Sequence, residues 1–428
     1  MERLLEIARK HADAATVYQA SGTQDGVGFE NARLKSADSA MRSGTALTLV
    51  KNGKQGFAYT RNLIDREGLV RDALAALAGG VEAAGDLPQP VKLPQLDTAA
   101  EPVGGNALLA EECRRVTDYL SERVKGQVNV GAGRGESEVR VLTSTGVDVR
   151  TRATQYFAMA QVLFPGTYSS ISRARAAKGF AAFPDADLQF IVDTYNASMR
   201  ETKGVPGRTR ALFLPGSVYA LVWRLGRATS ARNVYEKVSP LTGRIGEKIL
   251  GDRFTLADEP LNDAEPGARA FDDEGTPCRN LKLFENGVLR SYYNDRFYAA
   301  KTGTEPTGNG FRDDITSPPA SSLEHMTIPP GDKSLSDLLK LMGRGVVVAG
   351  VMGAHSGNLM HGDYSIGLAP GLWVENGAIV GVVKDAMVAG NVYEDLKNMI
   401  EVGDAVQHAP MGRFPALLLD NVSFSARA

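Results

Sequence analysis

Three residues close together in the sequence carry side chains that could hold a metal ion, namely His355, His361 and Asp363. Imidazole nitrogens and carboxylate oxygens are common zinc ligands, and a zinc ion held by them could activate water for hydrolysis. The glycines around them indicate a loop or strand, in which residues i and i+6 can share one face. The spacing therefore permits a hydrolase site here without requiring one, because surface histidines would give the same pattern.

Other catalytic motifs are missing from the sequence. It contains no GxxxxGK[ST] phosphate loop and no GxSxG nucleophile motif, and Ser365 in GDYSIG has one residue too many before it. The glycine cluster at residues 131–135 lacks the spacing of a dinucleotide-binding loop, so we predict a turn there. Cys113 and Cys278 would act as nucleophiles only beside an activating base, and we expect inert thiols, with Cys113 on a buried helix face.

The composition narrows the class of protein. The 428 residues include 48 Lys and Arg against 50 Asp and Glu, which gives no positive field that would draw in nucleic acid. The longest apolar stretch, residues 345–354, is about half of the ~20 residues that a membrane span needs. Two cysteines and an amphipathic N-terminus predict a cytosolic protein, and the absence of nucleotide-binding motifs agrees with a protein that requires no cofactor.

The elements that must position these residues follow from periodicity and turn signals. Asn-Gly pairs at residues 52–53, 286–287 and 376–377 predict three β-hairpins. Helical spacing occurs at residues 69–77, 107–124, 185–199, 217–230, 334–341 and 391–400. Because the Gly-Val-Pro-Gly break at 204–207 separates two sets of elements, we predict an α+β fold with two domains, 1–205 and 208–428. Each is expected to hold mixed or antiparallel sheets flanked by helices.

Several motifs in the second half occur in a recognisable order. They are NVYEKVSPLTGRIGEK from Asn233, FDDEG from Phe271, FENG from Phe284, TGNG from Thr307, GDYSIG from Gly362 and WVENG from Trp373. In this order and spacing they resemble the TldD/PmbA family, in which TldE is another name for the PmbA branch. The resemblance covers most of residues 210–428 and is weaker at 29–59. It implies a two-domain protein that dimerises, in which a TldD-type metallopeptidase subunit acts on unfolded or leader peptides beside a PmbA-type partner.

Residue types decide which branch the chain resembles. The TldD type carries HExxxH upstream of a Ser-Gly-Arg-Ile-Gly-Glu-like stretch and a cysteine near the C-terminus, which together hold zinc. Counting back without gaps from residues 243–247 places Val222, Trp223 and Arg227 at the motif positions, and no cysteine follows Cys278. The resemblance therefore implies the metal-free PmbA (TldE) type, without catalytic or metal-binding residues. We expect Trp223 to be buried, so that losing its ring would cost ~3–5 kcal/mol.

Three functions remain open at this stage. The first is a non-catalytic subunit that pairs with a TldD-like zinc peptidase, or with itself, and binds an extended peptide by strand addition. The second is a stand-alone hydrolase at the two histidines and Asp363, and the third is an adaptor of the gyrase-modulator kind. Loop residues that permit close backbone approach, or that only shape turns, are the candidates for lining a peptide channel in the dimer: Asn309, Gly310, Arg312, Asn358, Asp363 and Ser365.

Overall fold

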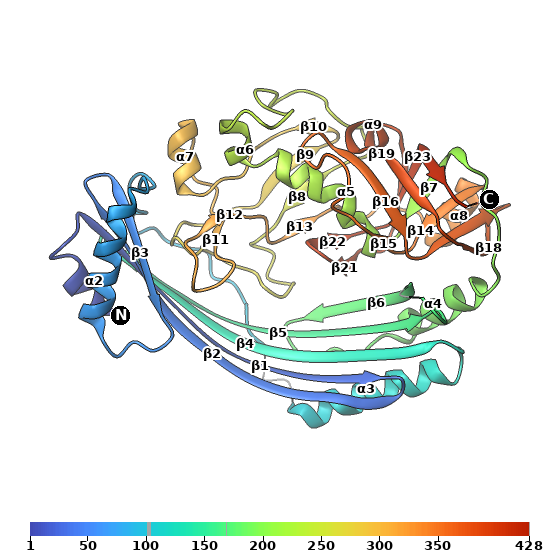
Figure 1. The fold of residues 1–428 in the computed structure, drawn as a ribbon, viewed down its shortest axis with the longest axis horizontal. Helices are drawn as coiled ribbons and strands as arrows, with labels where there is room; N and C mark the ends of the chain where they lie inside the picture. Colours follow the sequence, from blue (N-terminus) through green and yellow to red (C-terminus); the bar gives the residue numbers. More distant parts are fainter. Residues whose placement is uncertain (101–103, 168, 428) are drawn as a thin grey trace.

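The first half of the chain forms one long, curved sheet. The computed structural model describes residues 1–100, 104–167 and 169–427 (Figure 1). Six antiparallel strands pair in the order β3-β2-β1-β4-β5-β6. Their bounds are β1 Ala14–Glu30, β2 Arg33–Lys51, β3 Lys54–Thr60, β4 Gln127–Thr143, β5 Asp148–Leu163 and β6 Ser170–Ala177. In Figure 1 this sheet curves beneath the second half of the chain.

Helices cover one face of this sheet. They are α1 Glu2–Ala8, α2 Arg66–Ala76 with a 3-10 turn at Leu77–Gly79, α3 Asn106–Ser121 and α4 Asp185–Ala197. Alternate residues of β5, such as Tyr156 and Ala158, pack against α3 and α4 because side chains alternate across a strand. Cys113 is fully buried in the same cluster, which confirms the predicted buried helix face.

The predicted turn at residues 131–135 is wrong, because these residues lie inside β4. Pairing with β1 on one side and β5 on the other holds the backbone extended, although glycine has a low strand propensity. By alternation the three glycines lie on the same face as Val139 and Val141, which contact Phe271 of the second half. Neighbouring strands therefore outweighed the local turn signal.

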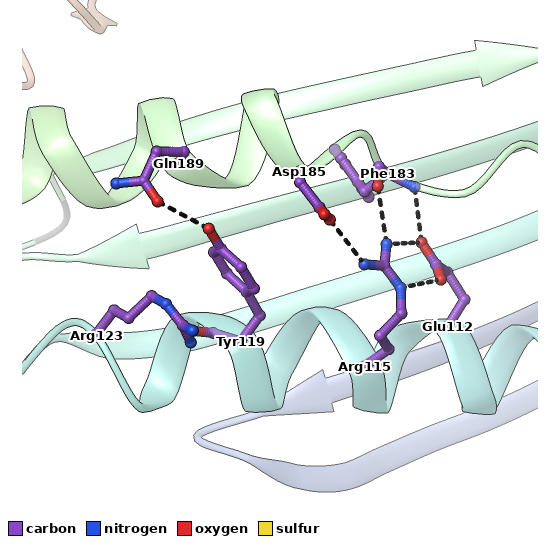
Figure 2. A network of polar contacts seen from close by, with 7 residues as sticks. All are labelled: Glu112, Arg115, Tyr119, Arg123, Phe183, Asp185 and Gln189. Carbon is purple, nitrogen blue, oxygen red and sulfur yellow. Dashed lines mark hydrogen bonds and ion pairs between the residues drawn. The ribbon is translucent and has the colours of Figure 1, made fainter.

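A polar network fastens the chain before α4 to α3 (Figure 2). The guanidinium of Arg115 donates two hydrogen bonds of 2.8 Å to Glu112, whose side chain is buried, and one of 2.9 Å to the carbonyl of Phe183. Glu112 also accepts the N–H of Phe183 at 2.7 Å. Burial opposes ionisation of Glu112, yet these hydrogen bonds outweigh burial and lower the pKa of its carboxyl group.

We expect Glu112→Gln to lower the free energy of unfolding by about 1–3 kcal/mol at neutral pH, because the amide cannot accept both guanidinium hydrogen bonds. The carboxylate contributes its stability above its ordinary pKa near 4.3 and loses it as the pH falls, so the difference between the two proteins should shrink in acid. Urea unfolding at pH 7 and pH 4 measures both effects. Tyr119→Phe, which removes only the exposed hydrogen bond to Gln189, is the control and should change stability by less than about 0.5 kcal/mol. Equal stability of Glu112→Gln and wild type at pH 7 would contradict this account.

The second half builds three further sheets. A nine-stranded sheet runs β15-β16-β19-β23-β7-β14-β17-β18 with β20 beside β23, a six-stranded sheet runs β10-β9-β8-β13-β22-β21, and β11 pairs with β12. The strand bounds are β7 Gly207–Phe213, β8 Leu256–Asp258, β9 Leu281–Glu285, β10 Val288–Leu289, β11 Gly310–Phe311, β12 Ala320–Ser321, β13 Met326–Thr327, β14 Gly345–Val348, β15 Val351–Met352, β16 Asp363–Leu368, β17 Gly371–Glu375, β18 Ala378–Val383, β19 Met387–Asn391, β20 Met399–Val402, β21 Gln407–Ala409, β22 Gly412–Phe414 and β23 Leu417–Ser425. The helices are α5 Pro215–Ala228, α6 Ala231–Tyr235, α7 Arg296–Thr302, α8 Leu335–Met342 and α9 Val392–Lys397.

Sheets flanked by helices in both halves confirm the predicted α+β fold. The three Asn-Gly hairpins are present, and each asparagine has a φ near +50°, as a type I′ turn requires. Every described strand up to Ala177 belongs to the first sheet, and every described strand from Gly207 belongs to one of the others. The division at residues 205–208 stays a prediction about folding units. None of the described helices has the length and apolar character needed to cross a membrane.

Candidate functional site

Helix α5 holds a loop of the second half through one buried arginine. Arg224 is fully buried, and its Nε donates to the carbonyl of Asp363 at 2.9 Å while Nη2 donates to the carbonyl of Ser356 at 2.7 Å. A third hydrogen bond reaches the carbonyl of Ala220 within the helix. Burial lowers the pKa of Arg224. The guanidinium therefore fixes residues 353–363, the segment with both histidines, against α5.

This loop presents polar side chains to solvent. His355, Asn358, His361 and Asp363 are all exposed. Asn358 accepts the N–H groups of Met360 and His361, and the Asp363 carboxylate accepts a hydrogen bond of 2.8 Å from Asn391. Within the described part of the chain, no three His, Cys, Asp or Glu side chains converge to hold a metal ion. The geometry thus gives the stand-alone hydrolase hypothesis no support.

The residues that the sequence analysis placed at the zinc-motif positions lie on α5 but face different surroundings. Val222 is fully buried in the main hydrophobic core, whereas Arg227 is exposed beside a shallow hollow of about 640 Å³ lined by residues 357–360. Trp223 is only partly buried, so the expected deeply buried indole is not found at this position. An aliphatic side chain, an indole and a guanidinium offer no lone pair to zinc, and these residues therefore do not fit the metal that the family motif would hold.

Asn309 and Gly310 lie in the interior, away from this loop. Asn309 is 1% exposed, and its amide donates to the Asp258 carboxylate at 2.9 Å and to the carbonyl of Ser322 at 3.1 Å. The N–H of Gly310 donates to Asp272 at 2.9 Å, and an added Cβ would meet the Glu274 carboxylate at 2.5 Å. Both residues take part in shaping a buried turn.

Arg312 connects the two halves of the chain. Its N–H donates to Asp273 at 3.0 Å, and its guanidinium lies 4.8 Å from the ring centre of Tyr18 and 5.3 Å from that of Phe57 in the first sheet. Cation–π contacts of this kind are stronger when they are desolvated. The six channel candidates therefore form two groups. Asn309, Gly310 and Arg312 form one group, and Asn358, Asp363 and Ser365 form the other, which lies in or beside the loop that Arg224 of α5 holds.

The two cysteines lack the environment of a nucleophile. Burial raises the pKa of Cys113 to about 11 and also raises that of Cys278. The Cys278 thiol donates to the carbonyl of Gly308 at 3.2 Å. Both thiols are thus protonated near neutral pH and poorly nucleophilic, as the sequence led us to expect.

The sequence analysis missed a cavity of about 800 Å³ between the two halves. Of the candidate residues, Ser365 lines it. Three partly exposed methionines, Met199, Met352 and Met387, also line it. Met199 follows α4, Met352 ends β15 and Met387 begins β19. No sequence pattern indicates that these three residues meet, because they lie far apart in the chain.

Family models match parts of both halves of the chain. The family described as the PmbA/TldA metallopeptidase C-terminal domain matches residues 206–426, and PmbA/TldA metallopeptidase domain 1 matches residues 15–84. An uncharacterized protein of Methanocaldococcus jannaschii is 26% identical over 419 residues, which cover 96% of each chain. The metalloprotease PmbA homolog of Haemophilus influenzae is 30% identical over 236 residues, which cover 55% of this chain and 49% of the relative.

Solved structures share the fold over the whole length. TldE from Thermococcus kodakarensis superposes with a TM-score of 0.90 at 23% identity and covers 100% of both chains. A proposed modulator of DNA gyrase from Thermotoga maritima gives a TM-score of 0.88 at 24% identity and covers 99% of both chains. The arrangement of sheets and helices described above is therefore common to all three proteins.

Proposed function

Since the chain belongs to the PmbA/TldD metallopeptidase family, we propose that it is a PmbA (TldE)-type subunit that has no catalytic residues of its own and works with a TldD-type zinc peptidase on unfolded or leader peptides. The observation that carries this proposal is the sequence of α5, in which the family resemblance aligns Val222, Trp223 and Arg227 with the zinc motif. None of these side chains can bind zinc or act as a general base. The two free cysteines favour a reducing compartment, so we place the complex in the cytosol.

A subunit of this kind contributes by holding the peptide. We assign this role to the surface around Asn358, Asp363 and Ser365, because the first two are exposed and the loop that carries them is fixed by Arg224. A fixed polar loop costs little conformational entropy when a peptide binds to it. The group of Asn309, Gly310 and Arg312 is assigned instead to joining the two halves.

We expect this chain to raise peptide cleavage by a TldD-type subunit at least about tenfold, because cleavage requires the peptide to be held in register with the zinc. The measurement mixes the two purified proteins at equal concentration with a disordered peptide and compares the rate with that of each protein alone. Size-exclusion chromatography with light scattering tests for a hetero-oligomer in the same mixture. Metal analysis should find zinc in the partner only.

Arg227→Ala is the control variant. Its side chain is exposed, so the fold and the partner's zinc content should both persist. If the TldD-type subunit alone cleaves as fast as the mixture and no hetero-oligomer forms, the proposal is wrong. A self-associated dimer as the sole species would favour the homodimer form of this subunit and exclude the heterodimer.

A further inference from the structure

A second cavity between the two halves, of about 220 Å³, carries carboxylates on its wall. Strands β1, β2 and β3 and residues 81–87 line it from the first half. The turn at residues 272–275, the start of α7 and the connection from β11 to β12 line it from the second half. Its volume lies below the ~300–1,000 Å³ of pockets for drug-sized ligands, so this cavity suits a compact group.

The FDDEG motif positions the first of these carboxylates. The buried Asp272 accepts the N–H groups of Glu274 at 3.0 Å and Thr276 at 2.9 Å, which closes the turn. Its other oxygen accepts the N–H of Gly310 at 2.9 Å, and a Cβ on that glycine would meet the Glu274 carboxylate at 2.5 Å. Glu274 is thereby directed to the start of α7, where its Oε2 accepts the N–H of Arg296 at 2.9 Å.

Asp295, the residue before α7, supplies the second carboxylate. It is only 5% exposed, and its Oδ1 accepts the N–H of Tyr298 at 2.8 Å. In the part of the chain that the structure describes, no hydrogen bond reaches Oδ2 of Asp295 or Oε1 of Glu274. Neither oxygen is sealed in the interior, so both face the cavity that their side chains line. Because buried charged groups are normally paired, these two oxygens indicate a cationic ligand.

The basic side chains nearby do not neutralise this pair of carboxylates. Among residues 1–100, 104–167 and 169–427, no ion pair includes Glu274 or Asp295, and the guanidiniums of Arg296 and Arg312 on the cavity wall donate to backbone carbonyls. Burial raises the pKa of Glu274, and the charges of Asp272 and Asp295 raise it further. A bound cation would be attracted by both carboxylates and would take the place of the proton.

The other two carboxylates on the wall already have partners. Asp273 accepts a hydrogen bond of 2.8 Å from Arg269 and the N–H of Arg312 at 3.0 Å. Glu82 forms an ion pair of 2.6 Å with Lys301. The uncompensated negative charge on the wall is therefore confined to Glu274 and Asp295.

The kind of cation follows from the number of ligands and from the rest of the wall. No three His, Cys, Asp or Glu side chains converge to hold a metal ion within the described residues. An ammonium group needs only hydrogen-bond acceptors and offers them three N–H donors. The apolar part of the wall consists of Val50, Val81, Leu87, Phe297, Pro318 and Pro319. A small apolar group that ends in an ammonium ion matches both parts of this wall.

We propose that this cavity binds a primary ammonium ion carried by a compact apolar group, whose N–H donors are accepted by Glu274 and Asp295. Two kinds of molecule share this chemistry, namely a free aliphatic amine and the amino-terminal residue of a peptide. The inference goes beyond the proposed function and does not depend on it, since neither α5 nor residues 353–363 line this cavity.

Calorimetric titration of the full chain tests this site without a partner or any activity. The probes at neutral pH are isoamylamine and isoamyl alcohol, which share their shape and differ in charge. We expect the amine to bind at least about tenfold more tightly, because its ammonium group donates charge-assisted hydrogen bonds to the two carboxylates. Methylamine lacks the apolar group and should bind at least about tenfold less tightly than isoamylamine. Leucinamide distinguishes the two sources, since tighter binding than isoamylamine would identify a peptide amino-terminus and weaker binding a free amine.

Two variants test the two parts of the wall, each with a matched control. E274Q keeps the shape of the side chain and an acceptor for the N–H of Arg296, and it should weaken amine binding at least about tenfold. E111Q makes the same change at an exposed position of α3 and should bind as wild type does. V81W should block the cavity with an indole, whereas V91W introduces the same ring outside it. These valines are 58% and 57% exposed, so both variants should fold.

Each outcome bears on the ammonium site alone. Equal affinity for the amine and the alcohol, or undiminished amine binding by E274Q, would overturn the proposal even if the chain stimulates a peptidase. Equal losses in V81W and V91W would overturn the assignment to this cavity. A preference for the amine that is lost in E274Q and V81W and kept in both controls would support the site even if no peptidase is stimulated.

Discussion

Replacing Arg224 with methionine is expected to lower the free energy of unfolding by about 2–5 kcal/mol. The unbranched methionine side chain fills most of the space, but the partly buried carbonyls of Ser356 and Asp363 lose their donors. A buried carbonyl left without a partner costs about 1–3 kcal/mol, these partly buried ones cost toward the lower end, and the gain from no longer burying a cation offsets part of this loss. Chemical denaturation of the variant and wild type measures the difference.

The local effect of Arg224→Met distinguishes this account from a general loss of packing. Amide hydrogen exchange should accelerate in residues 353–363, which the guanidinium holds, and stay unchanged in α3 and α4 of the first half. Arg227→Ala, one turn further along α5, should alter neither stability nor exchange because its side chain is exposed. Wild-type stability in Arg224→Met, or faster exchange spread evenly over the chain, would contradict the assigned role.

Grafting the zinc motif onto α5 is expected to cost stability without giving a metal site. In V222H/W223E/R227H, an imidazole would enter the core at Val222, which is fully buried, and a buried polar group without a partner costs about 1–3 kcal/mol. Residues five apart on a straight helix point about 140° apart, so the second imidazole at 227 would face solvent. We expect a marginally stable protein that holds less than one zinc ion per chain.

Metal analysis after dialysis and thermal unfolding with and without zinc measure both parts of this result. R227H alone is the matched control, because it adds one exposed imidazole and should unfold as wild type does. W223E alone should cost less than V222H alone, since Trp223 is only partly buried. One tightly held zinc per chain in the triple variant, with an increase in melting temperature, would show that α5 keeps the geometry of a metal site and would overturn the metal-free assignment.

Local sequence patterns, such as turn-forming pairs and helical spacing, predicted the hairpins and the helix α5 well. The Asn-Gly pairs specify hairpins because both turn residues adopt positive φ, which these two residue types tolerate without help from distant contacts. Helix α5 follows from its apolar spacing and begins at a proline, which is favoured in a first helical turn. The glycines of β4 show where this approach fails, since pairing with β1 and β5 overrode their local preference.

The sequence by itself determined the hairpins and the α+β class, because these depend on residue type and on spacing within one segment. Only the tertiary structure decided that Arg224 holds the 353–363 loop, that Asn309 is buried, and that three methionines line one cavity. These properties depend on contacts between residues more than 30 positions apart. No local pattern encodes such contacts, because they follow from how the whole chain buries its apolar surface.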